Sequence, residues 1–347
     1  MSIADFEFVS TCRNILRFGM NDKDFPVRPH WEDGTPAHTI KLHNVTSSYN
    51  LENGIPIMTL RKQGIKNAVD EILWIYQKKS NKISDLHSHI WDSWDIGDGT
   101  IGKAYGYQIG KPYRHHKFEG SVEDDVSIYP SLSVMTNKEA VENGYLKDSN
   151  NDHDWLMSEW VWMDQIDAVR YDIKNNPMSR SIITTTYNFN DLADMGLHPC
   201  AYSMTYNVRP TEHGVYLDGL LNQRSQDMLT ANNWNVIQYS ILLTILAKEA
   251  GYKPGRLMHV IGNCHIYDRH VPIVEELIKT YEDRLIRSKL FKEDNYMSFE
   301  ELSVVPYPNP DVWINPDKIN FYDYTVDDFK IEGYQYCEFN HKIEVAI

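Results

Sequence analysis

The stretch "LLNQRSQDMLTANNWNVIQY", residues 220–239, passes from the end of an apolar, strand-like run into the start of a strongly apolar, helix-like run. Between the two runs lie Gln223, Arg224, Ser225 and Asp227. A strand end that faces a helix start is a place where polar ligand groups converge. An arginine beside a serine there can bind a phosphate through its guanidinium and the hydroxyl. By itself the stretch also fits a surface turn that carries a salt bridge.

The sequence around this stretch mixes helix-like and strand-like patterns. Helices are predicted over 65–77, where apolar residues share one stripe, over 235–251, which is apolar nearly all round and ends at Gly251, and over 271–285. Strands are predicted from alternation or β-branched content over 181–188, 200–208, 214–221 and 256–262. Because strands and helices do not alternate strictly, the pattern favours an α+β fold over a doubly wound one.

Length and composition limit the class of protein. The 347 residues, 42% of them hydrophobic, are enough for one large core. No window approaches 18 uninterrupted apolar residues, so no membrane span is expected. The formal net charge of −15 would repel nucleic acid, so DNA or RNA is not expected as a primary partner. A small anion can still bind where a few arginines converge.

The four cysteines show no CxxC pair, which suits a reducing cytoplasm better than a disulfide scaffold. We therefore expect a cytoplasmic protein. No internal repeat is visible, and we expect a single domain over 1–347 with insertions at about 109–160 and 284–310. A metal hydrolase built on His87, His89, His115, His116 and the "NCH" motif (263–265) is a weak alternative, because the i, i+2 spacing gives no shared helical face and no carboxylate–histidine pattern accompanies it. We expect no bound metal.

Several separated motifs resemble, in one order along the chain, those of the thymidylate synthase family. The motifs are "DEILWIYQ" (70–77), "IWDSWDIGDGTIGKAYGYQ" (90–108), "SRSIITTTYN" (179–188), the Pro-Cys pair (199–200), "NQRSQDM" (222–228), "NNWN" (232–235), "GNCHIYDRH" (262–270) and the final "EVAI" (344–347). The segment "VRPHWEDGTPAHT" (27–39) resembles a subgroup found in low-GC Gram-positive bacteria and their phages.

The resemblance implies a mixed, twisted β-sheet packed by helices, with one sheet face forming a homodimer interface. It implies reductive methylation of dUMP to dTMP. The co-substrate would be 5,10-methylenetetrahydrofolate, which supplies both the one-carbon unit and the hydride and leaves as dihydrofolate.

The resemblance makes Cys200 the nucleophile that adds to carbon 6 of the pyrimidine. Carbon 5 of uracil is a poor nucleophile until such an addition, and a cation at Arg224 would lower the pKa of the thiol. Glu71 would relay protons through ordered water, and Tyr105 would take part in removing the carbon 5 proton. Asn235 and Asp227 complete the catalytic set. Cys12, Cys264 and Cys337 are expected to be buried and structural.

The residues implied in dUMP binding are Arg28, Arg180, Gln223, Arg224, Ser225, Asp227, Asn235, His265 and Tyr267. Arg180 would reach across from the partner subunit. Ser181 follows it where most members have a second arginine, which weakens the expected phosphate clamp. Asn235 would read uracil through its amide, and the group that holds this amide in place would share in the discrimination against cytosine.

The residues implied in folate binding are Ile90, Trp91, Trp94, Leu197, Asp227, Tyr267, Val345 and Ala346. Val345, Ala346 and Ile347 would close over the folate and exclude water. An alternative within the same superfamily is a pyrimidine nucleotide hydroxymethylase, in which water captures the one-carbon unit and no hydride moves. The two tryptophans and the C-terminal lid favour methylation.

Overall fold

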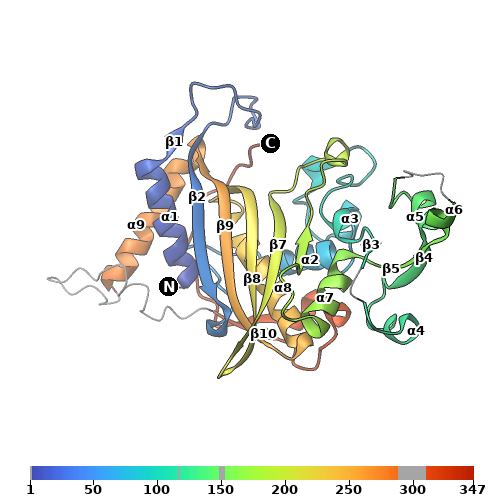
Figure 1. Ribbon diagram of the computed structural model, residues 1–347. Helices are drawn as coiled ribbons and strands as arrows, with labels where there is room; N and C mark the ends of the chain where they lie inside the picture. Colours follow the sequence, from blue (N-terminus) through green and yellow to red (C-terminus); the bar gives the residue numbers. More distant parts are fainter. Residues whose placement is uncertain (1, 116–117, 148–152, 288–309) are drawn as a thin grey trace.

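A six-stranded sheet is the centre of the computed structural model, which describes residues 2–115, 118–147, 153–287 and 310–347 (Figure 1). Its strands are β1 (Met20–Asn21), β2 (Thr39–Asn50), β6 (Ile183–Thr185), β7 (Ala201–Thr211), β8 (Gly214–Asp227) and β9 (Lys253–Tyr267). Their order is β1-β2-β9-β8-β7-β6, and only the β8–β9 pair is parallel. The α+β class and the mixed sheet are therefore confirmed.

The main helices bury two clusters of apolar side chains. These helices are α1 (Ile3–Phe18), α2 (Ile65–Tyr76), α7 (Gln165–Asn175), α8 (Asn232–Ala250) and α9 (Val271–Arg287). Helix α8 makes the crossover that a parallel strand pair requires, and it packs with α2 in the larger cluster. Because α8 is enclosed on most sides, its apolar residues are spread around the helix. Helices α1 and α9 supply the second cluster, beside β2 and β9.

A separate small sheet occupies the first expected insertion, 109–160. Its strands are β3 (Tyr113–Arg114), β4 (Ser133–Thr136) and β5 (Glu159–Met163), in the order β3-β5-β4. The short helices around it are α3 (Gly106–Ile109), α4 (Val122–Asp125), α5 (Asn137–Glu142) and α6 (His153–Met157). It has its own cluster of buried side chains, among them Tyr129 and Met163. The structure therefore gives this polar segment a local core that its sequence pattern did not predict.

The C-terminal part of the chain adds a hairpin of β10 (Asp311–Ile314) and β11 (Phe329–Glu332). The second expected insertion, 284–310, lies outside the described residues except at its ends. In the described part of the chain, no helix is long and apolar enough to cross a membrane.

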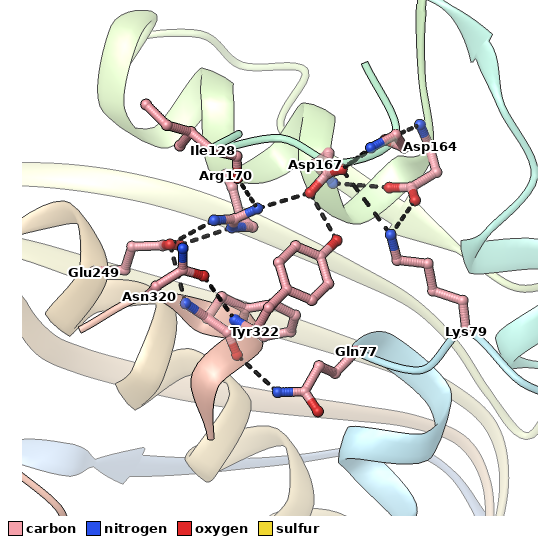
Figure 2. Close-up of polar contacts among 11 residues, drawn as sticks. Gln77, Lys79, Ile128, Asp164, Asp167, Arg170, Glu249, Asn320 and Tyr322 are labelled. Atoms are coloured by element: carbon pink, nitrogen blue, oxygen red, sulfur yellow. Dashed lines mark hydrogen bonds and ion pairs between the residues drawn. The ribbon is translucent and has the colours of Figure 1, made fainter. Parts of the chain in front are cut away.

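A buried polar network joins helix α7, helix α8 and the C-terminal part of the chain (Figure 2). Arg170 of α7 donates to both carboxylate oxygens of Glu249 on α8, at 2.9 and 2.6 Å, and to Asp167 at 2.8 Å. The Tyr322 hydroxyl donates to the same Asp167 carboxylate at 2.7 Å, and Lys79 bonds to Asp164. The Arg170 side chain is only 1% exposed, so its charge depends on these partners.

We predict that Arg170→Met lowers the free energy of unfolding by about 3–5 kcal/mol, because it leaves buried carboxylates without their cation. Urea denaturation measures the change. The control is Arg13→Met, which breaks an ion pair with Glu282 between two exposed side chains on helices α1 and α9. That variant should lose at most about 1 kcal/mol. Equal losses in the two variants would contradict the role of the buried network.

Candidate active site

Cys200 lies just before β7, in a turn whose backbone is held from two directions. Its N–H donates to the Tyr105 hydroxyl at 3.1 Å, and its carbonyl accepts from the Arg224 N–H at 2.9 Å. The Arg224 guanidinium donates to the carbonyls of Pro199 and His198, at 2.9 and 2.6 Å. The half-buried thiol is therefore presented from a fixed backbone beside a cation.

Two arginines and burial act in opposite directions on the Cys200 thiol. Burial raises its pKa, whereas the positive charges of Arg224 and Arg28 lower it, and the effect of burial is larger. The predicted effect of the Arg224 cation is therefore present, but the pKa is raised overall. The thiol is protonated at neutral pH, so any reaction at the sulfur requires the loss of this proton.

Tyr105 combines burial with an unusual backbone. Its φ of +43° is uncommon for a residue other than glycine, and such a conformation persists only where surrounding contacts hold it. The ring packs edge-on against Trp91, with centroids 5.1 Å apart. Burial raises the pKa of the phenol, so Tyr105 keeps its proton while its oxygen accepts the Cys200 N–H.

Glu71 of α2 is buried. Its position at the polar edge of the helix was also compatible with a solvent-exposed carboxylate, and the structure excludes that alternative. The indole N–H groups of Trp91 and Trp234 donate to its two oxygens, at 3.0 and 2.6 Å. Burial is the largest influence and raises the pKa of Glu71 to about 7, although both indoles lower it. A carboxyl group with such a pKa can both accept and donate a proton at neutral pH.

The strand register brings the other polar residues to the same end of the sheet. Asp227 is opposite His265, and Ala201 is opposite Gln223. Gln223 is buried and donates to the Asn235 side-chain oxygen at 3.1 Å. The Asp227 carboxylate accepts from Leu229 and Thr230 in the turn before α8, so part of its bonding capacity is already used.

The C-terminus lies beside the loop that carries Arg28. Ile347 exchanges two backbone hydrogen bonds with His30, at 2.8 and 3.0 Å, and Glu344 pairs with Arg269 at 3.1 Å. Figure 1 shows the chain end near the loop between β1 and β2. Arg28, in the same loop, lowers the pKa of Cys200. The loop therefore interacts with the chain end, which consists of Val345, Ala346 and Ile347, and also with the thiol.

The predicted folate residues fall into two groups. Trp91 and Trp94 are in edge-to-face contact, with centroids 5.4 Å apart, and Leu197 is half-buried in the segment that leads to Cys200. Ile90 is 38% exposed. Tyr267 lies edge-on to His265, with centroids 5.1 Å apart, and the thiol and Arg28 both influence the pKa of its phenol.

Among the predicted site residues, Arg180 has no contact in the described chain that would connect it with the thiol. It is exposed just before β6 and makes no ion pair with any described residue. Three residues were missed by the sequence analysis, namely Trp234, Gln238 and His259. Trp234 directly precedes Asn235 and Gln238 lies one helical turn later, which is a signal that spacing could have supplied.

Within the described ranges, no group of three or more His, Cys, Asp or Glu side chains could hold a metal ion. A thiol held beside cations, together with a buried carboxyl group whose pKa is near neutral, is an arrangement suited to enzymes that use a nucleophile.

Comparison with known proteins identifies the kind of enzyme. The sequence pattern of the thymidylate synthase family matches residues 6–347. The thymidylate synthase of Bacillus licheniformis is 33% identical over 351 residues, covering 100% of both chains. That of Bacillus phage phi3T is 33% identical and covers 97% of this chain and 96% of its own. A solved structure, thermostable thymidylate synthase A from Bacillus subtilis, matches with a TM-score of 0.71 at 31% identity, over 99% of each chain.

The chain therefore belongs to the thymidylate synthase family, which places it among the methyltransferases. The predicted resemblance to a subgroup of low-GC Gram-positive bacteria and their phages is confirmed by these Bacillus and phage relatives.

The raised pKa of Glu71 leads to a prediction about stability. Between pH 4.5 and 7 the unfolded chain loses the Glu71 proton while the folded chain keeps it, so stability falls as pH rises. We compare the free energies of unfolding of the unmodified protein and of the Glu71→Gln variant. The value of the unmodified protein minus that of the variant should fall by about 3 kcal/mol from pH 4.5 to pH 7. Urea denaturation of both proteins at fixed concentration and several pH values measures the drop. A difference that does not change with pH would show that Glu71 titrates normally.

Proposed function

We propose that this protein is a thymidylate synthase that methylates dUMP to dTMP and releases dihydrofolate, with Cys200 as the nucleophile. The observation that carries the proposal is the thiol of Cys200 held beside Arg28 and Arg224, with Tyr105 linking it to the Glu71 and Trp91 pair. Family membership supports the reaction, and it does not favour the hydroxymethylase alternative.

The Cys200 thiol loses its proton to solvent, its sulfur bonds to carbon 6 of uracil, and the electron pair of the ring double bond moves toward the carbonyl at position 4. Arg28 and Arg224 stabilise the thiolate that attacks. Asn235 donates to the carbonyl oxygen, where negative charge develops, and Glu71 exchanges a proton with it through water. Tyr105, which stays protonated, helps to pass on the carbon 5 proton.

The co-substrate 5,10-methylenetetrahydrofolate supplies the one-carbon unit and the hydride. Trp91, Trp94 and Leu197 offer the flat apolar surface that suits its ring system. Ile90, Asp227 and Tyr267 border it, and Val345 and Ala346 exclude water as the chain end closes. His265 and Tyr267 hold the deoxyribose.

The phosphate would be bound by Arg28, Arg224 and Ser225 of one subunit and by Arg180 of its partner. This requires a homodimer, and the sheet offers a face for it. One register row crosses the sheet as Ile183, Thr205, Leu220 and Met258, all of them half-buried or exposed. Ile183 is 46% exposed and Leu220 is 36% exposed, which favours a covering partner.

The four cysteines are free thiols, which fits a reducing compartment, so we place the enzyme in the cytoplasm. We also propose that 1–347 form one catalytic domain, with 109–160 inserted into it as the separate small sheet.

The proposal predicts that dUMP and 5,10-methylenetetrahydrofolate give dTMP and dihydrofolate. The rise in absorbance as dihydrofolate forms measures the reaction. Cys200→Ser should reduce turnover by about 10⁴-fold or more, because a hydroxyl is a far weaker nucleophile than a thiol. Cys337→Ser is the matched control and should retain the rate. Cys337 is half-buried rather than buried as expected, and its sulfur accepts from Arg284 at 3.3 Å. Tetrahydrofolate with hydroxymethyl-dUMP as products would establish the hydroxymethylase instead.

The shared site predicts that two inactive variants restore activity when their subunits exchange. In a hybrid dimer of Cys200→Ser and Arg180→Ala, one site receives both native residues and the other receives neither. Random exchange should give about a quarter of the activity of the unmodified protein at the same concentration, because half of the dimers are hybrids and each hybrid has one working site of two. Each variant incubated alone is the control. No recovery in a sample whose hybrids are seen by native mass spectrometry would exclude a shared Arg180.

A further inference from the structure

Three amide side chains and one histidine form an unbroken hydrogen-bonded chain behind the base-reading residue. His259 of β9 contacts the Gln223 side-chain oxygen through Nε2 at 2.7 Å. Gln223 Nε2 donates to Asn235 Oδ1 at 3.1 Å, and Asn235 Nδ2 donates to Gln238 Oε1 at 3.0 Å. His259, Gln223 and Gln238 are 0%, 3% and 1% exposed, so water does not compete for these contacts.

Such a chain has only two self-consistent directions. Turning one amide by 180° places two donors or two acceptors against each other, so all three amides have to turn together. The direction decides which edge Asn235 presents. With its oxygen toward Gln223, the amide keeps one free lone pair and one free N–H. These complement the ring N–H and the carbonyl of uracil, whereas the reversed amide complements cytosine.

The histidine end selects one direction. Burial lowers the pKa of His259 to about 3, so the ring is neutral and carries one N–H. Its Nδ1 has no hydrogen-bond partner among the described residues. A proton on Nε2 is accepted by Gln223, whereas a proton on Nδ1 would leave a buried donor unsatisfied. His259 therefore donates, which turns the Gln223 oxygen toward it and the Gln223 N–H toward Asn235.

The other end of the chain selects the same direction. The Gln238 amide lies close enough to Glu71 to lower the pKa of that carboxyl group. Its Nε2 makes no hydrogen bond to any described residue, so its N–H groups are available to the Glu71 carboxylate. With its N–H toward the carboxylate, Gln238 turns its oxygen toward Asn235, as the structure shows.

We propose that His259 is a positioning residue for base recognition, which acts through Gln223 to hold the Asn235 amide in the orientation that accepts uracil and rejects cytosine. This inference rests on the proposed function. His259 does not touch the nucleotide in this scheme, and its contribution is the fixed direction of the chain.

The test measures the dissociation constants of dUMP and dCMP by calorimetry. His259→Phe removes the donor and keeps a buried ring, so the preference for dUMP should fall about tenfold, mainly through tighter dCMP binding. His259→Gln restores an N–H at the same end and should recover most of the preference. Leu257→Ala, a cavity on the same strand and the same face, is the control for general loosening and should keep the preference.

An unchanged preference in folded His259→Phe, or an equal loss in Leu257→Ala, would overturn the inference. If the unmodified protein does not prefer dUMP, the proposed function itself fails, which is a separate result. A second measurement uses the unmodified protein, so it does not depend on whether a variant folds. Nitrogen-15 NMR of the histidine rings should show His259 neutral with its proton on Nε2, and a proton on Nδ1 would reverse the chain and overturn the inference.

Discussion

The register of β7, β8 and β9 is the constraint on which the site depends. Ala201 pairs with Gln223, and Asp227 pairs with His265, so the turn that carries Cys200 and the buried Gln223 amide meet at one end of the sheet. A slip of one residue between two of these strands would turn the site residues of one strand to the opposite face. The apolar helix α8 prevents such a slip, because its burial against β8 and β9 requires the same register.

The site places ionisable groups where burial works against their charge. Glu71, Tyr105 and Cys200 all have raised pKa values, and in each case burial is the largest cause. Other parts of the fold offset this unfavourable burial, namely the large core and the hydrogen-bonded Arg170 network (Figure 2). The gain is chemical, since a carboxyl group with a pKa of about 7 moves protons in both directions.

Local patterns predicted helices α2 and α8 and strands β7 and β8 because each pattern reflects one buried face. The same reasoning missed β2, whose polar residues alternate weakly, and the small sheet of the insertion, whose core contains few residues. Motif order indicated Cys200, Glu71 and Asn235. It could not show that burial outweighs the arginines at Cys200, or that His259 ends a hydrogen-bonded chain, because both depend on contacts between distant segments. Arg180 stays a prediction, since its role needs a second subunit.

The central claim is that the sulfur of Cys200 bonds to the uracil ring during the reaction. A direct measurement is mass spectrometry of the protein after incubation with fluorinated dUMP and 5,10-methylenetetrahydrofolate, because fluorine at carbon 5 blocks the later proton removal and traps the adduct. The account predicts a mass increase equal to nucleotide plus folate, located on the peptide that contains Cys200. An adduct on another side chain, or no adduct on folded protein, would contradict it.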